Sequence, residues 1–262
     1  ISLLVIALVT FGVMGGLCAK SHLYPDEWLS MFFLTLIFLL VCMFELEYER
    51  KPKGISANTQ TTFIRLSVTY TVSGGLIYAI SYLPEFYRPV MIPVILLTAV
   101  SNSMVAVSFG LFFDLVLALT VGGSFYALAA YMMLTMLAAV LAQALKEKKY
   151  RMGVSLLTFF FSLMIPELFS YLSTKEMQKY SLLYAFGTAF LTFLTAAFLF
   201  HRLLHEADQE IENHLLDIVS EDYSEVKALK DFSMVEYRHA VKVSDIACRC
   251  AKEVGYRANL CL

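Results

Sequence analysis

The carboxyl-terminal part of the chain carries a short tract with a histidine whose imidazole could take part in chemistry. Residues 237–240 read Tyr-Arg-His-Ala, and His239 is the histidine. Imidazole binds divalent metals and transfers protons near neutral pH. Apolar residues recur around it at helical spacing, so the sequence predicts a helix with His239 on or beside its buried stripe. That stripe is Val235, His239, Val243, Ile246, Cys250 and Val254. For an isolated histidine in this position, a hydrogen-bonded core residue is favoured over a metal ligand.

Two acidic residues interrupt strongly apolar segments. Asp114 lies within an aromatic and aliphatic run, and Glu167 directly follows Pro166. A charged group at membrane depth is costly unless it faces a partner or water. Two interpretations stay open: the carboxyls line a polar cavity that senses or moves a solute, or they pack against Ser, Thr or Tyr hydroxyls. The packed interpretation is favoured. The cysteines form no CxxC pair, which favours reduced structural thiols over a zinc site.

Composition defines the class of protein that holds these groups. The chain is 59% hydrophobic, 14% aromatic and only 16% charged. A soluble globule needs a more polar surface, so we expect a polytopic membrane protein in contact with the lipid bilayer. The net charge of −2 and the absence of a basic surface pattern argue against nucleic-acid binding.

An all-α fold with about eight membrane spans is predicted. A bilayer needs about 20 apolar residues per helix, and breaks at residues 101–103 and 122–123 divide the long run from 89 to 145 into three helices. The second of these three is the shortest. The predicted spans are 2–19, 28–46, 62–83, 89–105, 108–121, 124–145, 153–172 and 182–200.

The basic residues predict the orientation of these spans. Arg50, Lys51 and Lys53 follow the second predicted span, and four more basic residues lie between 146 and 151, after the sixth. Such short basic loops stay in the cytoplasm. Eight spans then place both termini in the cytoplasm of a multi-pass cell-membrane protein.

The chain becomes polar and amphipathic after Phe200. We predict a transmembrane domain over 1–203, a cytoplasmic connector helix over 204–223 and the start of a further helical domain over 224–262. Leucine and isoleucine at helical spacing within 204–218 are compatible with a homodimer or with a plain amphipathic connector. Beyond it, the spacing predicts helices over 225–232 and 235–254, the second ending at Gly255.

Several short motifs occur in the order of a known family. They are Ile92-Pro93-Val94, Leu215-Leu216-Asp217-Ile218, the helix-forming segment that begins at Ser224, Tyr237-Arg238-His239-Ala240, and an amphipathic helix over 241–255. In this order the chain resembles the membrane-anchored HD phosphohydrolases. These are seven-transmembrane receptors with an intracellular HD hydrolase domain, and they include cyclic di-AMP phosphodiesterases.

The resemblance implies a function for one residue. His239 takes the place of the family's first metal-ligating histidine, in a site that holds two divalent metals and hydrolyses a phosphodiester. The His-Asp pair and the other ligands are expected beyond Leu262, so we expect the chain to be truncated within its HD domain and inactive by itself. The complete protein would use divalent metal ions and a cyclic dinucleotide substrate.

Three departures from the family keep other functions open. Arg238 and Ala240 replace a frequent His and the usual Ser, and residues 20–27 stand where the family has a large extracellular domain. A membrane sensor or signalling scaffold with a degenerate HD domain is therefore the first alternative. A small-solute transporter built around Asp114 is the second.

Overall fold

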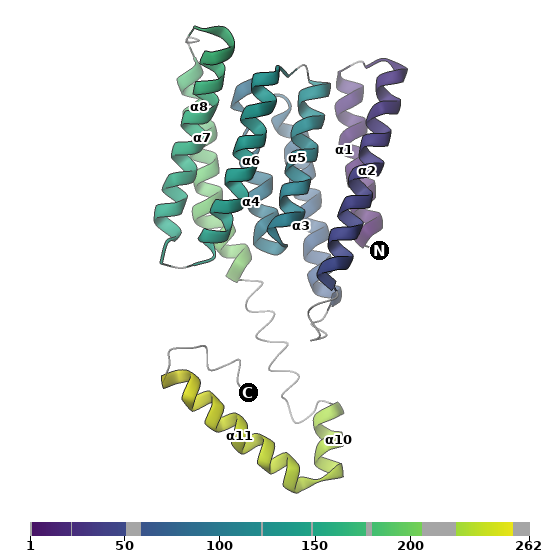
Figure 1. Ribbon diagram of the computed structural model, residues 1–262, viewed down its shortest axis with the longest axis vertical. Coiled ribbons are helices and arrows are strands. Elements are labelled where there is room, and N and C mark those ends of the chain that lie inside the picture. Colours follow the sequence, from purple (N-terminus) through teal and green to yellow (C-terminus); the bar gives the residue numbers. More distant parts are fainter. Residues whose placement is uncertain are drawn as a thin grey trace. The chain divides into compact units, whose positions relative to one another are not determined.

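The computed structural model describes residues 2–21, 23–50, 59–121, 123–147, 149–176, 180–205 and 224–253. Within these residues the chain is helical and contains no strand. It divides into two compact units, Ile1–Leu204 and His205–Leu262. The larger unit is a bundle of roughly aligned helices (Figure 1).

The bundle is formed by eight helices. They are α1 (Ser2–Lys20), α2 (Pro25–Arg50), α3 (Thr59–Ile80), α4 (Met91–Val100), α5 (Ser103–Thr120), α6 (Phe125–Leu145), α7 (Arg151–Thr174) and α8 (Ser181–Leu194). A short 3₁₀ turn, η1 (Glu85–Tyr87), precedes α4, and a π-helical segment, η2 (Thr195–Leu199), carries α8 onward. The described part of the chain is therefore all-α, as predicted.

Local sequence explains where several helices begin and end. Asn102 has an extended backbone between α4 and α5, which confirms the predicted break there. The Ser124 hydroxyl accepts a hydrogen bond from the Ala127 amide at 3.2 Å and so caps α6. Lys175 ends α7 in the left-handed conformation, with φ 55°. The Ser124 hydroxyl and the Lys175 amide, which donates to the Tyr171 carbonyl at 2.7 Å, each satisfy one of the free backbone groups that a helix end leaves.

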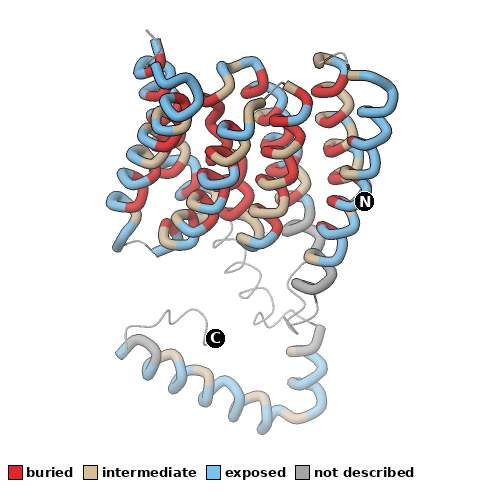
Figure 2. Tube along the Cα trace, turned by 45° about the horizontal axis from the view of Figure 1, so that its top comes forward, coloured by how far each residue is buried: buried red, intermediate tan, exposed pale blue. Residues whose placement is uncertain are grey.

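The helices pack in an order that places α4 and α5 at the centre. α4 contacts α3, α5 and α6, while α1 packs on α3, α2 on α5, α6 on α7 and α7 on α8. Eight of the ten residues of α4 are buried. In Figure 2 buried residues gather inside the bundle, and the outward faces of its outer helices are exposed.

Five described segments are long and apolar enough to cross a membrane. They are Pro25–Glu45, Ser103–Thr120, Phe125–Leu145, Arg151–Thr174 and Ser181–His205, and shorter apolar helices cover Leu4–Lys20 and Ile64–Ile80. Large apolar side chains are exposed on the outside of the bundle, including Phe44, Val140 and Leu183. Lipid rather than water suits such a surface, so the protein is membrane-associated.

The lengths of the three helices between residues 89 and 145 differ from the prediction. We expected the second to be the shortest, but α5 has 18 residues and α4 has only 10. Hydropathy cannot distinguish a lipid-exposed helix from one buried among other helices, and α4 is of the second kind. A count of eight spans remains a prediction.

The smaller unit contains α10 (Ser224–Phe232) and α11 (Met234–Glu253). Their bounds lie within one residue of the predicted ones. The expected buried stripe on α11 is wrong: Val235, Val243 and Ile246 are 77%, 52% and 62% exposed. In the described part of this unit only α10 packs on α11, which leaves most of the apolar face uncovered. Residues 206–223, and so most of the predicted connector and the 204–218 dimer contact, lie outside the described residues.

Candidate functional site

Asp114 lies on α5 with its side chain buried, only 1% exposed. The Thr135 hydroxyl on α6 donates a hydrogen bond to Asp114 Oδ2 at 2.7 Å. Asp114 Oδ1 has no hydrogen-bond partner among the described residues. A carboxyl held by one donor and buried in an apolar interior can bind a proton or a cation, or can serve packing alone. The position agrees with the predicted packing against a hydroxyl.

Close approach of three helices creates this arrangement. Gly110 lies one turn before Asp114, and a Cβ atom there would be 2.6 Å from Thr135 Cγ2 and 2.8 Å from Val94 Cγ2. Only glycine therefore lets α4 and α6 contact α5 at this level. The contact places Thr135 within reach of the Asp114 carboxylate.

A second polar group lies around Arg88, next to η1. Arg88 is 4% exposed, and its guanidinium donates to the Tyr131 hydroxyl at 3.2 Å and to the Leu83 carbonyl at 3.3 Å. The Tyr131 hydroxyl donates in turn to the Glu85 carbonyl. The Ser124 amide donates to the Glu85 carboxylate. These bonds fasten the α3–α4 connection to α6, one helical turn from Thr135.

Glu167 belongs to a different hydrogen-bonded group. The Tyr87 hydroxyl donates to Glu167 Oε1 at 3.4 Å. Burial raises the pKa of the Tyr87 phenol. Glu167 thus joins η1 to α7, and no described contact connects it with Asp114. The structure does not bring the two predicted carboxyls together.

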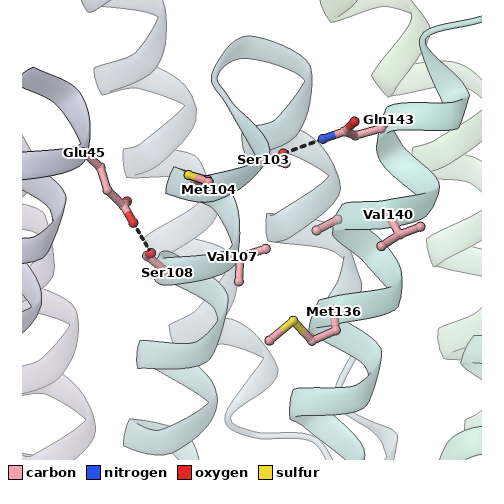
Figure 3. Close-up of a pocket in the computed structure, with 9 residues that line it drawn as sticks. Glu45, Ser103, Met104, Val107, Ser108, Met136, Val140 and Gln143 are labelled. Carbon is pink, nitrogen blue, oxygen red and sulfur yellow. Dashed lines mark hydrogen bonds between the residues drawn. The ribbon is translucent and has the colours of Figure 1, made fainter. Parts of the chain in front are cut away.

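A groove on the side of the bundle opens between α2 and α6, above α5 (Figure 3). Its volume is about 420 Å³. Its lining residues are Glu45, Ser103, Met104, Val107, Ser108, Met136, Ala139, Val140 and Gln143. The sequence did not predict this groove, because Glu45 resembles the ordinary polar end of a span. The one available signal was a carboxylate in the last apolar turns of α2.

His239 lies on α11 with its side chain exposed. The α11 helix begins at a Ser233 hydroxyl that accepts from the Glu236 amide at 3.3 Å. Lys230 Nζ lies 5.5 Å from the centre of the Tyr237 ring, which joins α10 to α11. The exposure of His239 leaves its imidazole accessible, and its role as a metal ligand stays a prediction.

The described residues do not fit a binuclear metal site. No group of three or more His, Cys, Asp or Glu side chains gathers anywhere in the described ranges. A single imidazole on α11 supplies too few ligands for two metals. Any such site requires ligands from other residues.

Comparisons of the chain with protein-family models, with curated proteins and with solved structures gave no match.

Proposed function

We propose that this chain is the membrane and linker portion of an HD-family phosphohydrolase. The complete protein would hydrolyse a cyclic dinucleotide such as cyclic di-AMP with divalent metal ions. These residues would supply the membrane anchor, the signal input and one metal ligand, His239. By themselves they would not catalyse hydrolysis.

The observation that carries the proposal is the pair of helices α10 and α11. They follow the membrane bundle in the order expected for the family, and α11 carries Tyr237-Arg238-His239-Ala240 with an accessible imidazole. The exposed apolar residues of α11 also support the proposal. Helices of a larger domain present such a face to their neighbours.

The experiment compares metal-dependent hydrolysis of cyclic di-AMP by the complete protein and by the chain ending at Leu262, with Mn²⁺ and Mg²⁺ supplied in turn. We expect turnover only from the complete protein. His239→Ala should lower it about 100-fold or more, because a metal ligand is lost. The neighbouring exposed Arg238→Ala is the matched control and should change turnover less than about twofold.

Two results would contradict the proposal. One is metal-dependent turnover by the chain ending at Leu262. The other is a His239→Ala protein that folds, by circular dichroism, and hydrolyses cyclic di-AMP at the wild-type rate.

A membrane sensor or signalling scaffold is the second candidate. Arg238 and Ala240 favour it, since both depart from the family pattern beside His239. The uncovered face of α11 would then bind a partner. A complete protein that lacks turnover but still responds to a membrane signal would favour this function. A small-solute transporter built around Asp114 is the third candidate, and solute flux unchanged by Asp114→Asn would remove its support.

A further inference from the structure

The groove between α2 and α6 has one polar end. Glu45 Oε1 accepts a hydrogen bond from the Ser108 hydroxyl at 2.6 Å, and Gln143 Nε2 donates to the Ser103 hydroxyl at 2.6 Å. Figure 3 shows both pairs at the rim, on opposite sides of α5. The polar end lies where the sequence of α2 turns polar, from Glu45 to Arg50, and near the first residue of α5. We therefore place it at the level of the lipid headgroups.

Two polar groups at this end can each form a further hydrogen bond. Glu45 Oε2 is shielded from solvent and has no hydrogen-bond partner among the described residues. Because a buried carboxylate oxygen without a donor is destabilising, it is a position for a cationic donor. The Gln143 amide nitrogen carries two hydrogens, and its hydrogen bond to Ser103 uses one. The second can donate to an anionic oxygen.

The rest of the groove is apolar and faces outward. Met104, Met136 and Val140 are 65%, 49% and 69% exposed. Met136 lies beyond Ser108 and Val107, on the side away from Glu45 and Gln143 (Figure 3). In a bilayer these side chains contact acyl chains. The groove thus combines a carboxylate near one end with an outward-facing apolar surface that includes Met136, in the middle of α6.

We propose that this groove binds a membrane lipid whose headgroup carries a primary ammonium, such as phosphatidylethanolamine. The Glu45 side chain turns its shielded Oε2 into the groove and accepts from the ammonium. The phosphate accepts from the second amide hydrogen of Gln143, and one acyl chain lies along Val107, Met136 and Val140. A quaternary amine has no N–H to donate, so phosphatidylcholine is a poor substitute. The sideways opening onto lipid favours a bilayer component over a soluble amine.

This inference does not depend on the proposed hydrolase function. The full chain is placed in vesicles with equal amounts of phosphatidylethanolamine and phosphatidylcholine and then extracted in mild detergent. Native mass spectrometry measures the lipids that stay bound. We expect one retained phosphatidylethanolamine in preference to phosphatidylcholine. Glu45→Gln should lower that preference about tenfold, the factor that a hydrogen bond to a charged group supplies.

Matched variants distinguish a lipid bound in the groove from the general effects of removing a charge or adding a large side chain. Glu147→Gln removes an exposed carboxylate just beyond α6 and should leave the preference unchanged. Val140→Trp fills the groove without touching Glu45 and should reduce lipid retention, whereas Leu157→Trp, on the exposed face of α7, should not.

Equal retention of the two lipids by the wild-type chain would overturn the proposal. Wild-type preference in a folded Glu45→Gln protein would also overturn it. A lipid-free dimer that Val140→Trp dissociates would assign the groove to a second copy of the chain instead.

Discussion

The Asp114 carboxyl depends on a single hydroxyl donor from a neighbouring helix. Thr135 Oγ1 lies 2.7 Å from Asp114 Oδ2, and Oδ1 has no partner among the described residues. Loss of that donor would leave a buried carboxyl with no hydrogen bond. The free energy of unfolding should therefore be more sensitive to Thr135 than to other buried threonines of the bundle.

Thr135→Val should lower the free energy of unfolding by about 1–3 kcal/mol, because it leaves a buried acceptor unsatisfied. Thr98→Val is the matched control. Thr98 is equally buried, but its hydroxyl donates only to the Val94 carbonyl of its own helix, at 2.7 Å. Its loss should cost less than about 1 kcal/mol. Thermal unfolding in detergent measures the stability of both variants. Equal unfolding midpoints for Thr135→Val and Thr98→Val would contradict the prediction.

At the scale of the helices, Gly110 determines how closely α4, α5 and α6 approach. The atoms that an added Cβ would meet belong to Val94 and Thr135, both β-branched. Such side chains have few rotamers available in a helix, so they cannot move aside easily. The backbone would have to shift instead.

We expect Gly110→Ala to destabilise the protein by about 1–3 kcal/mol, the usual range for an overpacked core. Gly75→Ala provides the comparison, since a Cβ at Gly75 meets nothing within 4 Å. Better helix propensity should stabilise that variant by up to about 1 kcal/mol. Unfolding midpoints in detergent report both effects. A Gly110→Ala protein as stable as Gly75→Ala would show that the three helices separate without cost.

The sequence predicted where the helices lie along the chain better than it predicted which helices and side chains contact one another. Apolar runs and the breaks near Asn102 and Gly123 gave the helices of the bundle, because each break depends on nearby residues alone. The length of α4 was missed, since hydropathy is the same for a helix surrounded by lipid and one surrounded by protein. The Asp114–Thr135 and Glu45–Ser108 bonds join residues 21 and 63 positions apart. Only tertiary packing could identify those partners.

At the scale of the whole molecule, the helix ends that meet at the groove indicate how the chain is oriented in the membrane. The groove is lined by residues from the end of α2, the start of α5 and the end of α6, which therefore meet at one end of the bundle. Basic residues follow both α2 and α6 in the sequence. The ends of α2 and α6 that lead into these basic segments meet at one end of the bundle, which supports the expectation that both segments face the cytoplasm.

Cysteine labelling tests that orientation across α7. Lys149 and Glu176 flank the two ends of this helix, and both are exposed. Lys149→Cys and Glu176→Cys are each introduced into a chain whose native cysteines are replaced by serine. A membrane-impermeant maleimide should label the cysteine at 176 in intact cells, and the one at 149 only after permeabilisation, because basic loops remain in the cytoplasm. Ala142→Cys, at a buried position, is the unlabelled control. Labelling of both sites in intact cells would show that α7 does not cross the membrane, and the reverse pattern would invert the predicted orientation.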